Sequence, residues 1–233
     1  MMKIEVIVQN VNDAIEAEKL GADRLELVTA IDEGGLTPTF EVMKDVLQHV
    51  TIPVQIMIRP HSKSFHYSED AMENVLTRIQ DVISAGGDRI VFGAITEDGT
   101  VDQRAIETIT RAYPALDITF HKAFDEVTDQ IEAYRVLQKY PQIKRILTSG
   151  GASNCMEGKN QLKALRELSE NGEGPVIMPG AGLSPENIQL IHKHVKADEY
   201  HFGRAVRVKD SYDHSFSKHA LETIYSYMKN ERG

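Results

Sequence analysis

The chain has 233 residues, of which 41% are apolar and 26% are charged, so its composition is that of a globular domain rather than a disordered chain. The sum of 26 Lys and Arg against 35 Asp and Glu is −9, which disfavours binding to nucleic acid or to an anionic membrane surface. A single cysteine, Cys155, excludes an intrachain disulfide, and no apolar run is long enough to span a bilayer. Without a recognisable signal peptide, the sequence predicts a cytoplasmic protein.

Short β-branched runs alternate with amphipathic stretches along the sequence. These runs predict eight strands, near residues 3–9, 23–28, 53–59, 88–93, 116–121, 143–149, 174–179 and 197–202. Eight strands that alternate with helices predict a parallel sheet closed into a (β/α)8, TIM-barrel-like α/β fold. We expect one domain over residues 1–233, with a C-terminal helix near 215–230; a doubly wound open sheet is the alternative.

Helix signals lie between the predicted strands. Apolar residues recur at helical spacing across residues 72–83. Thr37-Pro38 and Ser184-Pro185 each place a capping residue before a proline, which predicts two helix N-termini. Gly21 and Gly86 stand where helices are expected to end.

Alternation within the strands predicts which side chains point into the barrel. The predicted inward set is polar: Glu5, Gln9, Glu26, Gln55, Arg59, Thr119, His121, Glu199 and His201. A barrel that only had to fold would fill these positions with Val, Ile and Leu, because a buried unpaired carboxylate costs several kcal/mol. The set therefore predicts a functional site. The alternative is a structural ion-pair network of Glu5 and Glu26 with Arg59.

Four residues form the predicted catalytic set. Glu26, Arg59 and His121 lie toward the C-terminal ends of their strands, where barrel enzymes keep their sites. Glu26 or His121 would move a proton, and Arg59 would hold an anionic group. Asp125 either orients His121 or caps the next helix. Lys122 is expected to point outward, which argues against a Schiff-base lysine.

Glycine-rich loops predict a second part of the site. The loops after the last two strands are where many barrels bind phosphate through backbone N–H groups, although a plain tight turn is the alternative. A further donor cluster follows the strand near 143–149. The predicted ligand-binding residues are Ser149, Gly150, Gly180, Gly182, Gly203 and Arg204. The remaining loop and helix histidines are expected at the surface: His61, His66, His192, His194, His214 and His219.

Six motifs resemble those of a known family. They are Glu-Gly-Gly-Leu-Thr-Pro (33–38), Ile-Met-Ile-Arg-Pro (56–60), Val-Phe-Gly-Ala-Ile-Thr-Glu-Asp-Gly (91–99), Thr-Phe-His-Lys-Ala-Phe-Asp (119–125), Leu-Thr-Ser-Gly-Gly (147–151) and Met-Pro-Gly-Ala-Gly (178–182). In this order they resemble the CutC family, which is named for copper homeostasis. The resemblance implies a barrel fold, a cytoplasmic location, oligomers of identical chains and copper-ion binding.

The sequence departs from that family at two positions. Many relatives carry cysteines in the first and second strands, where this chain has Ile7 and Val28. Because Cu(I) prefers thiolates, the predicted metal ligands Glu26, His121 and His201 suit a divalent ion better, such as Cu(II), Zn or Mn. Two functional hypotheses follow: copper handling, or an enzyme that acts on a small polar or phosphorylated metabolite by acid/base chemistry. A binding protein without catalysis is a third hypothesis.

Overall fold

Eight parallel strands form the barrel. The computed structural model describes residues 2–170 and 174–230, with side chains up to residue 227. The strands are β1 (Lys3–Val8), β2 (Arg24–Leu27), β3 (Val54–Met57), β4 (Arg89–Phe92), β5 (Asp117–Phe120), β6 (Ile143–Thr148), β7 (Val176–Pro179) and β8 (Glu199–Phe202). They pair in the order β7-β6-β5-β4-β3-β2-β1-β8. A bridge between Gly180 and His201 brings the two edges of this sheet together.

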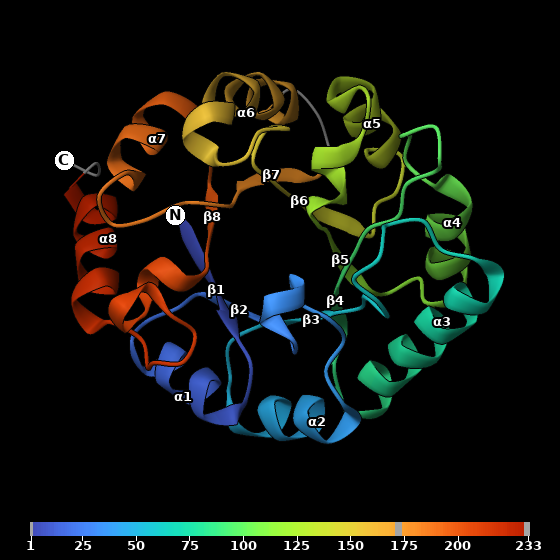
Figure 1. Cartoon of the computed structure of the whole chain (residues 1–233), viewed down its shortest axis with the longest axis horizontal. Coiled ribbons are helices and arrows are strands. Elements are labelled where there is room, and N and C mark those ends of the chain that lie inside the picture. Colours follow the sequence, from blue (N-terminus) through green and yellow to red (C-terminus); the bar gives the residue numbers. More distant parts are fainter. Residues whose placement is uncertain (1, 171–173, 231–233) are drawn as a thin grey trace.

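The helices form a ring around the strands, as Figure 1 shows in a view along the barrel. They are α1 (Val11–Lys19), α2 (Phe40–His49), α3 (Glu69–Ser84), α4 (Gln103–Ala112), α5 (Gln130–Leu137), α6 (Cys155–Glu170), α7 (Ile188–Val195) and α8 (Lys218–Asn230). Short 3-10 turns η1 (Ile31–Glu33), η2 (Lys122–Glu126), η3 (Arg204–Val206) and η4 (Val208–Asp210) lie in the connections. The predicted barrel and its C-terminal helix are confirmed. No helix of the described residues is both long and apolar enough to cross a bilayer.

The apolar core lies between the sheet and the helix ring. On β1, Ile4, Val6 and Val8 are fully buried and face the helices, as the alternation predicts. The predicted helix ends are also confirmed. Gly21 and Gly86 follow α1 and α3 with φ angles of +93° and +95°, a backbone conformation that favours glycine.

Two predicted helix starts are displaced along the chain. The cap of α2 is Thr39, whose hydroxyl accepts from the Val42 N–H, whereas the Thr37 hydroxyl accepts from the Arg59 N–H at 2.8 Å. The cap position of α7 is Asn187 rather than Ser184. In both cases the proline precedes the first helical residue by two or more positions, so neither proline stands in the first turn of its helix.

All eight strands are shorter than predicted, and at β3 and β5 this changes where two predicted site residues lie. Arg59 lies two residues beyond the end of β3, and His121 lies one residue beyond β5. Both residues therefore stand at the C-terminal rim of the barrel rather than in its interior layers.

Candidate functional site

An ion-pair network fills the barrel near the N-terminal ends of the strands. Arg24 of β2 donates to a carboxylate oxygen of Glu5, and its Nη2 lies 2.6 Å from Glu199 Oε2. These acids therefore pair with Arg24, not with Arg59, which corrects the predicted Glu5–Glu26–Arg59 network. Arg24 lies two residues before Glu26, so strand alternation alone could have placed it in the barrel.

The network continues across the barrel through Asp117 of β5. Its carboxylate accepts from both terminal nitrogens of Arg145, from Arg89 at 2.6 Å and from Gln55 at 3.0 Å. Arg145 Nε lies 3.5 Å from Glu199 Oε2, which joins the two halves. Asp117 has the same parity as Thr119 and His121, so alternation along this strand could have placed it in the barrel as well.

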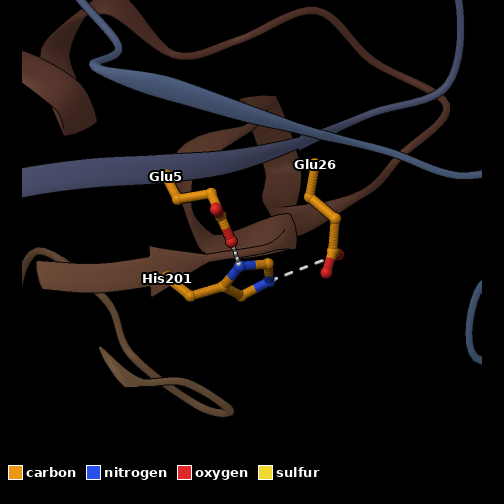
Figure 2. A group of neighbouring side chains, drawn as sticks. All are labelled: Glu5, Glu26 and His201. Atoms are coloured by element: carbon orange, nitrogen blue, oxygen red, sulfur yellow. Dashed lines mark hydrogen bonds and ion pairs between the residues drawn. The ribbon is translucent and has the colours of Figure 1, made fainter. Parts of the chain in front are cut away.

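Glu5, Glu26 and His201 form a buried group on the adjacent strands β1, β2 and β8, as Figure 2 shows. One possible ligand atom from each residue lies within 4.8 Å of the others. Nδ1 of His201 lies 2.8 Å from Glu5 Oε1, and its Nε2 lies 3.7 Å from Glu26 Oε2. Glu26 Oε1 has no hydrogen-bond partner among the described residues. The group can therefore accept a proton or a metal ion at the side of Glu26.

Charge and burial act differently on these three residues. Burial raises the pKa of Glu5, but Arg24 and His201 outweigh burial and hold that pKa well below its ordinary value. Burial raises the pKa of Glu26, and the charge of Glu5 adds to this effect. Burial lowers the pKa of His201, but the two carboxylates outweigh it and raise the pKa. Glu5 is therefore ionised, while Glu26 and His201 compete for a proton.

His121 lies in a different environment, at the end of β5. Its Nδ1 accepts from the Ala123 N–H at 3.1 Å, and its buried Nε2 has no partner in the described part of the chain. Burial, together with the charge of Arg59, lowers the pKa of His121 to about 3, so the ring is neutral at physiological pH. His121 is not part of the metal-ligand group; Glu5 is the third member instead. This corrects the predicted ligand set of Glu26, His121 and His201.

Arg59 points away from the ion-pair network. Its Nη1 donates to the carbonyl oxygens of Glu33 at 3.1 Å and Gly35 at 3.4 Å, and its Nη2 donates to that of Ser62 at 3.4 Å. Within the described ranges, no carboxylate lies in ion-pair distance of Arg59. The side chain thus joins the loop after β2 to the loop after β3.

Asp125 neither orients His121 nor caps the next helix. Its carboxylate accepts from the Thr148 hydroxyl at 2.5 Å and from the amides of Ser149 and Gly151 at 3.0 and 2.9 Å. The cap of α5 is Asp129. Both expectations for Asp125 are therefore wrong, because its carboxylate holds the loop after β6.

A cavity of about 560 Å³ lies at the C-terminal end of the barrel. It is lined by four of the predicted ligand-binding residues, Gly180, Gly182, Gly203 and Arg204, and by His201, Tyr212 and Lys122. Tyr212 carried no recognisable signal in the sequence. Lys122 was expected to point outward, but the chain turns into η2 at this residue and strand alternation no longer applies.

Ser149 and Gly150 do not line this cavity. The Ser149 amide donates to Asp125, its hydroxyl donates to the Ala152 carbonyl oxygen at 2.6 Å, and the Gly150 amide donates to the Thr148 hydroxyl at 2.9 Å. The expectation that these donors are free for a ligand is therefore wrong.

The surface prediction for the histidines holds only in part. His66, His214 and His219 are exposed, whereas His61, His192 and His194 are half-buried. His192 bonds to the Tyr200 hydroxyl at 2.8 Å, and the Nδ1 atom of His61 is buried.

Replacing Arg24 tests the ion-pair network. Arg24→Met leaves Glu5 and Glu199 buried without their main counter-charge, so we expect the free energy of unfolding to fall by about 3–5 kcal/mol. Urea denaturation measures this change. Arg104→Met, which removes a highly exposed arginine paired with Glu69, is the matched control and should change stability little. Equal effects of the two substitutions would contradict the network's role.

The neutral state of His121 predicts a pH dependence of stability. An unfolded histidine titrates near pH 6.5 and the folded His121 near 3, so between these values the unfolded chain binds the extra proton. The contribution of His121 to the free energy of unfolding is complete above pH 6.5. It decreases by up to about 1.4 kcal/mol for each pH unit as the pH is lowered below that value. We expect His121→Gln to flatten the stability profile between pH 6.5 and 5 in urea unfolding.

The exposed His219→Gln variant is the control for this experiment. It should follow the wild-type profile. A His121→Gln profile with the wild-type slope would show that the buried ring takes up its proton as readily in the folded protein as in the unfolded chain.

Comparison with known proteins agrees with this architecture. The CutC family profile matches residues 2–205. A "copper homeostasis protein cutC homolog" from Homo sapiens is 40% identical over 199 residues, which is 85% of this chain and 71% of that protein. A "family protein CutC" from Salmonella heidelberg (strain SL476) is 38% identical over 189 residues, 81% of this chain and 75% of that protein.

Solved structures show the same relationship. The putative copper homeostasis protein CutC from Streptococcus agalactiae superposes with a TM-score of 0.81 at 30% identity, over 87% of this chain and 98% of that one. Phosphoribosyl anthranilate isomerase from Thermotoga maritima has a TM-score of 0.64 at 12% identity over 99% of this chain and 100% of that one, and shares the fold alone. From the match over residues 2–205 and these relatives, the chain belongs to the CutC family.

Proposed function

We propose that this chain binds a divalent copper ion inside its barrel, through His201 and Glu26, and that this is its part in copper homeostasis. The observation that carries the proposal is the buried group of Glu5, Glu26 and His201, in which Glu26 Oε1 has no partner among the described side chains. The names of the human and Streptococcus agalactiae relatives, which refer to copper homeostasis, support the choice of metal.

The hydrogen bond of Glu5 prepares His201 for a metal ion. An ionised Glu5 accepts a hydrogen bond from the Nδ1–H of His201, so the lone pair of the neutral ring lies on Nε2, toward Glu26. A carboxylate that orients a ligating histidine in this way is common at metal sites. A bound ion would replace the proton for which Glu26 and His201 compete, so binding releases a proton.

The donor set distinguishes the two oxidation states of copper. Carboxylate oxygen and imidazole nitrogen suit Cu(II), which such N/O sites bind more tightly than the other divalent first-row metals. Cu(I) prefers thiolate, but Cys155 lies on α6 outside the barrel, and burial, together with the charge of Asp125, raises the pKa of its thiol to about 12. The thiol is therefore protonated and a poor ligand.

The cavity at the C-terminal end of the barrel supplies a path to this group. His201 lines that cavity together with Tyr212, and the charge of Glu26 acts on the Tyr212 hydroxyl. An ion that enters the cavity therefore meets His201 first and Glu26 behind it.

Titration of metal-free protein with Cu(II), followed by electron paramagnetic resonance, tests the proposal. We expect one tight Cu(II) per chain, with hyperfine coupling to one imidazole nitrogen. His201→Gln and Glu26→Gln should each weaken binding by about 10- to 100-fold or more, because each removes a ligand. Cys155→Ser should bind like the wild type, and the exposed His219→Gln is the matched histidine control.

Two results would refute the copper proposal. One is unchanged Cu(II) binding in His201→Gln. The other is tight binding of copper that depends on Cys155.

A second candidate function is supported by the cavity itself. Glycine-rich loops after β7 and β8, with Arg204 at the rim, are suited to a phosphate group. Glu26 and His201 lie next to this cavity, and the pKa of each is raised, which suits acid/base catalysis on a small polar or phosphorylated metabolite. We further propose, from the family resemblance, that the protein is cytoplasmic and assembles from identical chains.

Binding of inorganic phosphate, measured by calorimetry, tests the second candidate. Arg204→Gln should weaken phosphate binding about 3- to 10-fold, because it removes a charged donor at the cavity rim. The exposed Arg111→Gln on α4 makes the same change of charge elsewhere and should have no effect. If the wild-type protein does not bind phosphate, this candidate function is rejected.

A further inference from the structure

The connection between β3 and α3, residues 58–68, covers a cluster of polar atoms that lack partners. Eight buried side-chain nitrogen or oxygen atoms have no hydrogen-bond partner within the described part of the chain. Four of these eight lie together here: Arg59 Nε, His61 Nδ1, the Tyr67 hydroxyl and His121 Nε2. Because buried polar groups are normally paired with protein, ordered water or a ligand, a concentration of groups unpaired within the chain marks a place where a ligand can bind.

The ring of Phe65 lies against two members of this cluster, Arg59 and His121. The guanidinium carbon of Arg59 lies 4.8 Å from the centre of that ring, and the His121 ring centre lies 4.7 Å from it. The rings of His61 and Tyr67 are 5.4 Å apart. The charge of Arg59 acts on both His121 and Tyr67, so these three groups share one electrostatic environment.

Three of the four unpaired atoms are hydrogen-bond donors. Arg59 Nε and the Tyr67 hydroxyl each carry a hydrogen. His121 is neutral and its Nδ1 accepts from the Ala123 amide, so its single hydrogen lies on Nε2. A ligand that satisfies this cluster must therefore supply acceptor atoms.

Arg59 differs from the other buried arginines in its charge balance. Arg24 pairs with Glu5, Arg145 with Asp117, and Arg207 with Asp13. Arg59 is 9% exposed, slightly more than these three; its guanidinium bonds to carbonyl oxygens and lies over the Phe65 ring, and among the described side chains no carboxylate lies within 4.0 Å of it. A buried guanidinium without a counter-charge indicates that the missing ligand is an anion.

We propose that the protein binds a small organic monocarboxylate beneath the connection between β3 and α3, with the carboxylate between Arg59 and His121. A single negative charge matches the one guanidinium, and its two oxygens accept from Arg59 Nε and His121 Nε2. A phosphate dianion would need a second cation, which the neutral His121 does not provide. The site shares no residue with the proposed copper ligands, so each proposal can be tested independently of the other.

Binding requires the ring of Phe65 to move aside. The connection contains no helix or strand, and the hydrogen bonds that hold its middle part include the Ile95 amide to the Phe65 carbonyl oxygen at 3.0 Å and the Ser62 hydroxyl to Glu33 Oε2 at 2.6 Å. Opening the site breaks these hydrogen bonds and the packing of Phe65 against the core. The connection therefore acts as the cover of the site.

Titration of the full, metal-free chain with lactate, followed by nuclear magnetic resonance of ¹⁵N-labelled histidine, tests this proposal. We expect saturable binding that shifts the Nε2–H signal of His121. Arg59→Gln should weaken lactate binding at least about tenfold, because it removes a charge-assisted hydrogen bond. Arg104→Gln, at a highly exposed position on α4, should bind lactate like the wild type.

Arg59 also joins two loops, so a folding control is needed. Arg59→Lys keeps the charge but lacks the Nε–H donor, and circular dichroism shows whether each variant is folded. Undiminished lactate binding by folded Arg59→Gln would overturn the proposal, as would an absence of lactate binding by the wild type. Tighter binding of inorganic phosphate than of lactate, with the same shift of His121, would overturn the assignment to a carboxylate. Unchanged Cu(II) binding in Arg59→Gln is expected, and a loss of Cu(II) binding would overturn the separation of the two sites.

Discussion

The pairing of Arg24 with Glu5 and Glu199 is the interaction on which the interior of the barrel depends. Carboxylates buried in this way are stable only with a counter-charge, and Arg24 supplies it across three neighbouring strands, β1, β2 and β8. Because Arg24 keeps Glu5 ionised, Glu5 can hold the Nδ1–H of His201. That bond in turn directs Nε2 of His201 toward Glu26, as Figure 2 shows. The ion pair of Arg24 and Glu5 thus orients His201, the proposed metal ligand.

The fold was predictable because its determinants are local and repeated. Strand alternation, helical periodicity and the glycines at 21 and 86 each specify a short segment, and eight such units leave few alternatives to a closed barrel. The ends of the elements were less predictable, because they depend on contacts made elsewhere. The Thr37 hydroxyl accepts from the Arg59 amide instead of capping α2, and nothing near residue 37 indicates this partner.

The sequence predicted which side chains of the candidate site point into the barrel, but not which of them pair with one another. Alternation correctly placed Glu5, Glu26 and His201 inside the barrel, but it cannot say which acid lies against which base. Asp125 shows the limit most clearly, since three of the groups that donate to it, those of Thr148, Ser149 and Gly151, lie 23 to 26 residues away at the end of β6 and in the loop after it. His121 was grouped with Glu26 and His201 because all three occupy the same parity, yet β5 is not a neighbour of β1, β2 or β8.

The central claim is that Cu(II) binds between His201 and Glu26 and not at a thiol. X-ray diffraction from crystals grown with Cu(II), measured on both sides of the copper absorption edge, locates the ion directly. We predict one strong anomalous peak inside the barrel, within bonding distance of Nε2 of His201 and a carboxylate oxygen of Glu26. A peak at Cys155, or anomalous density confined to histidines on the outer surface, would contradict it.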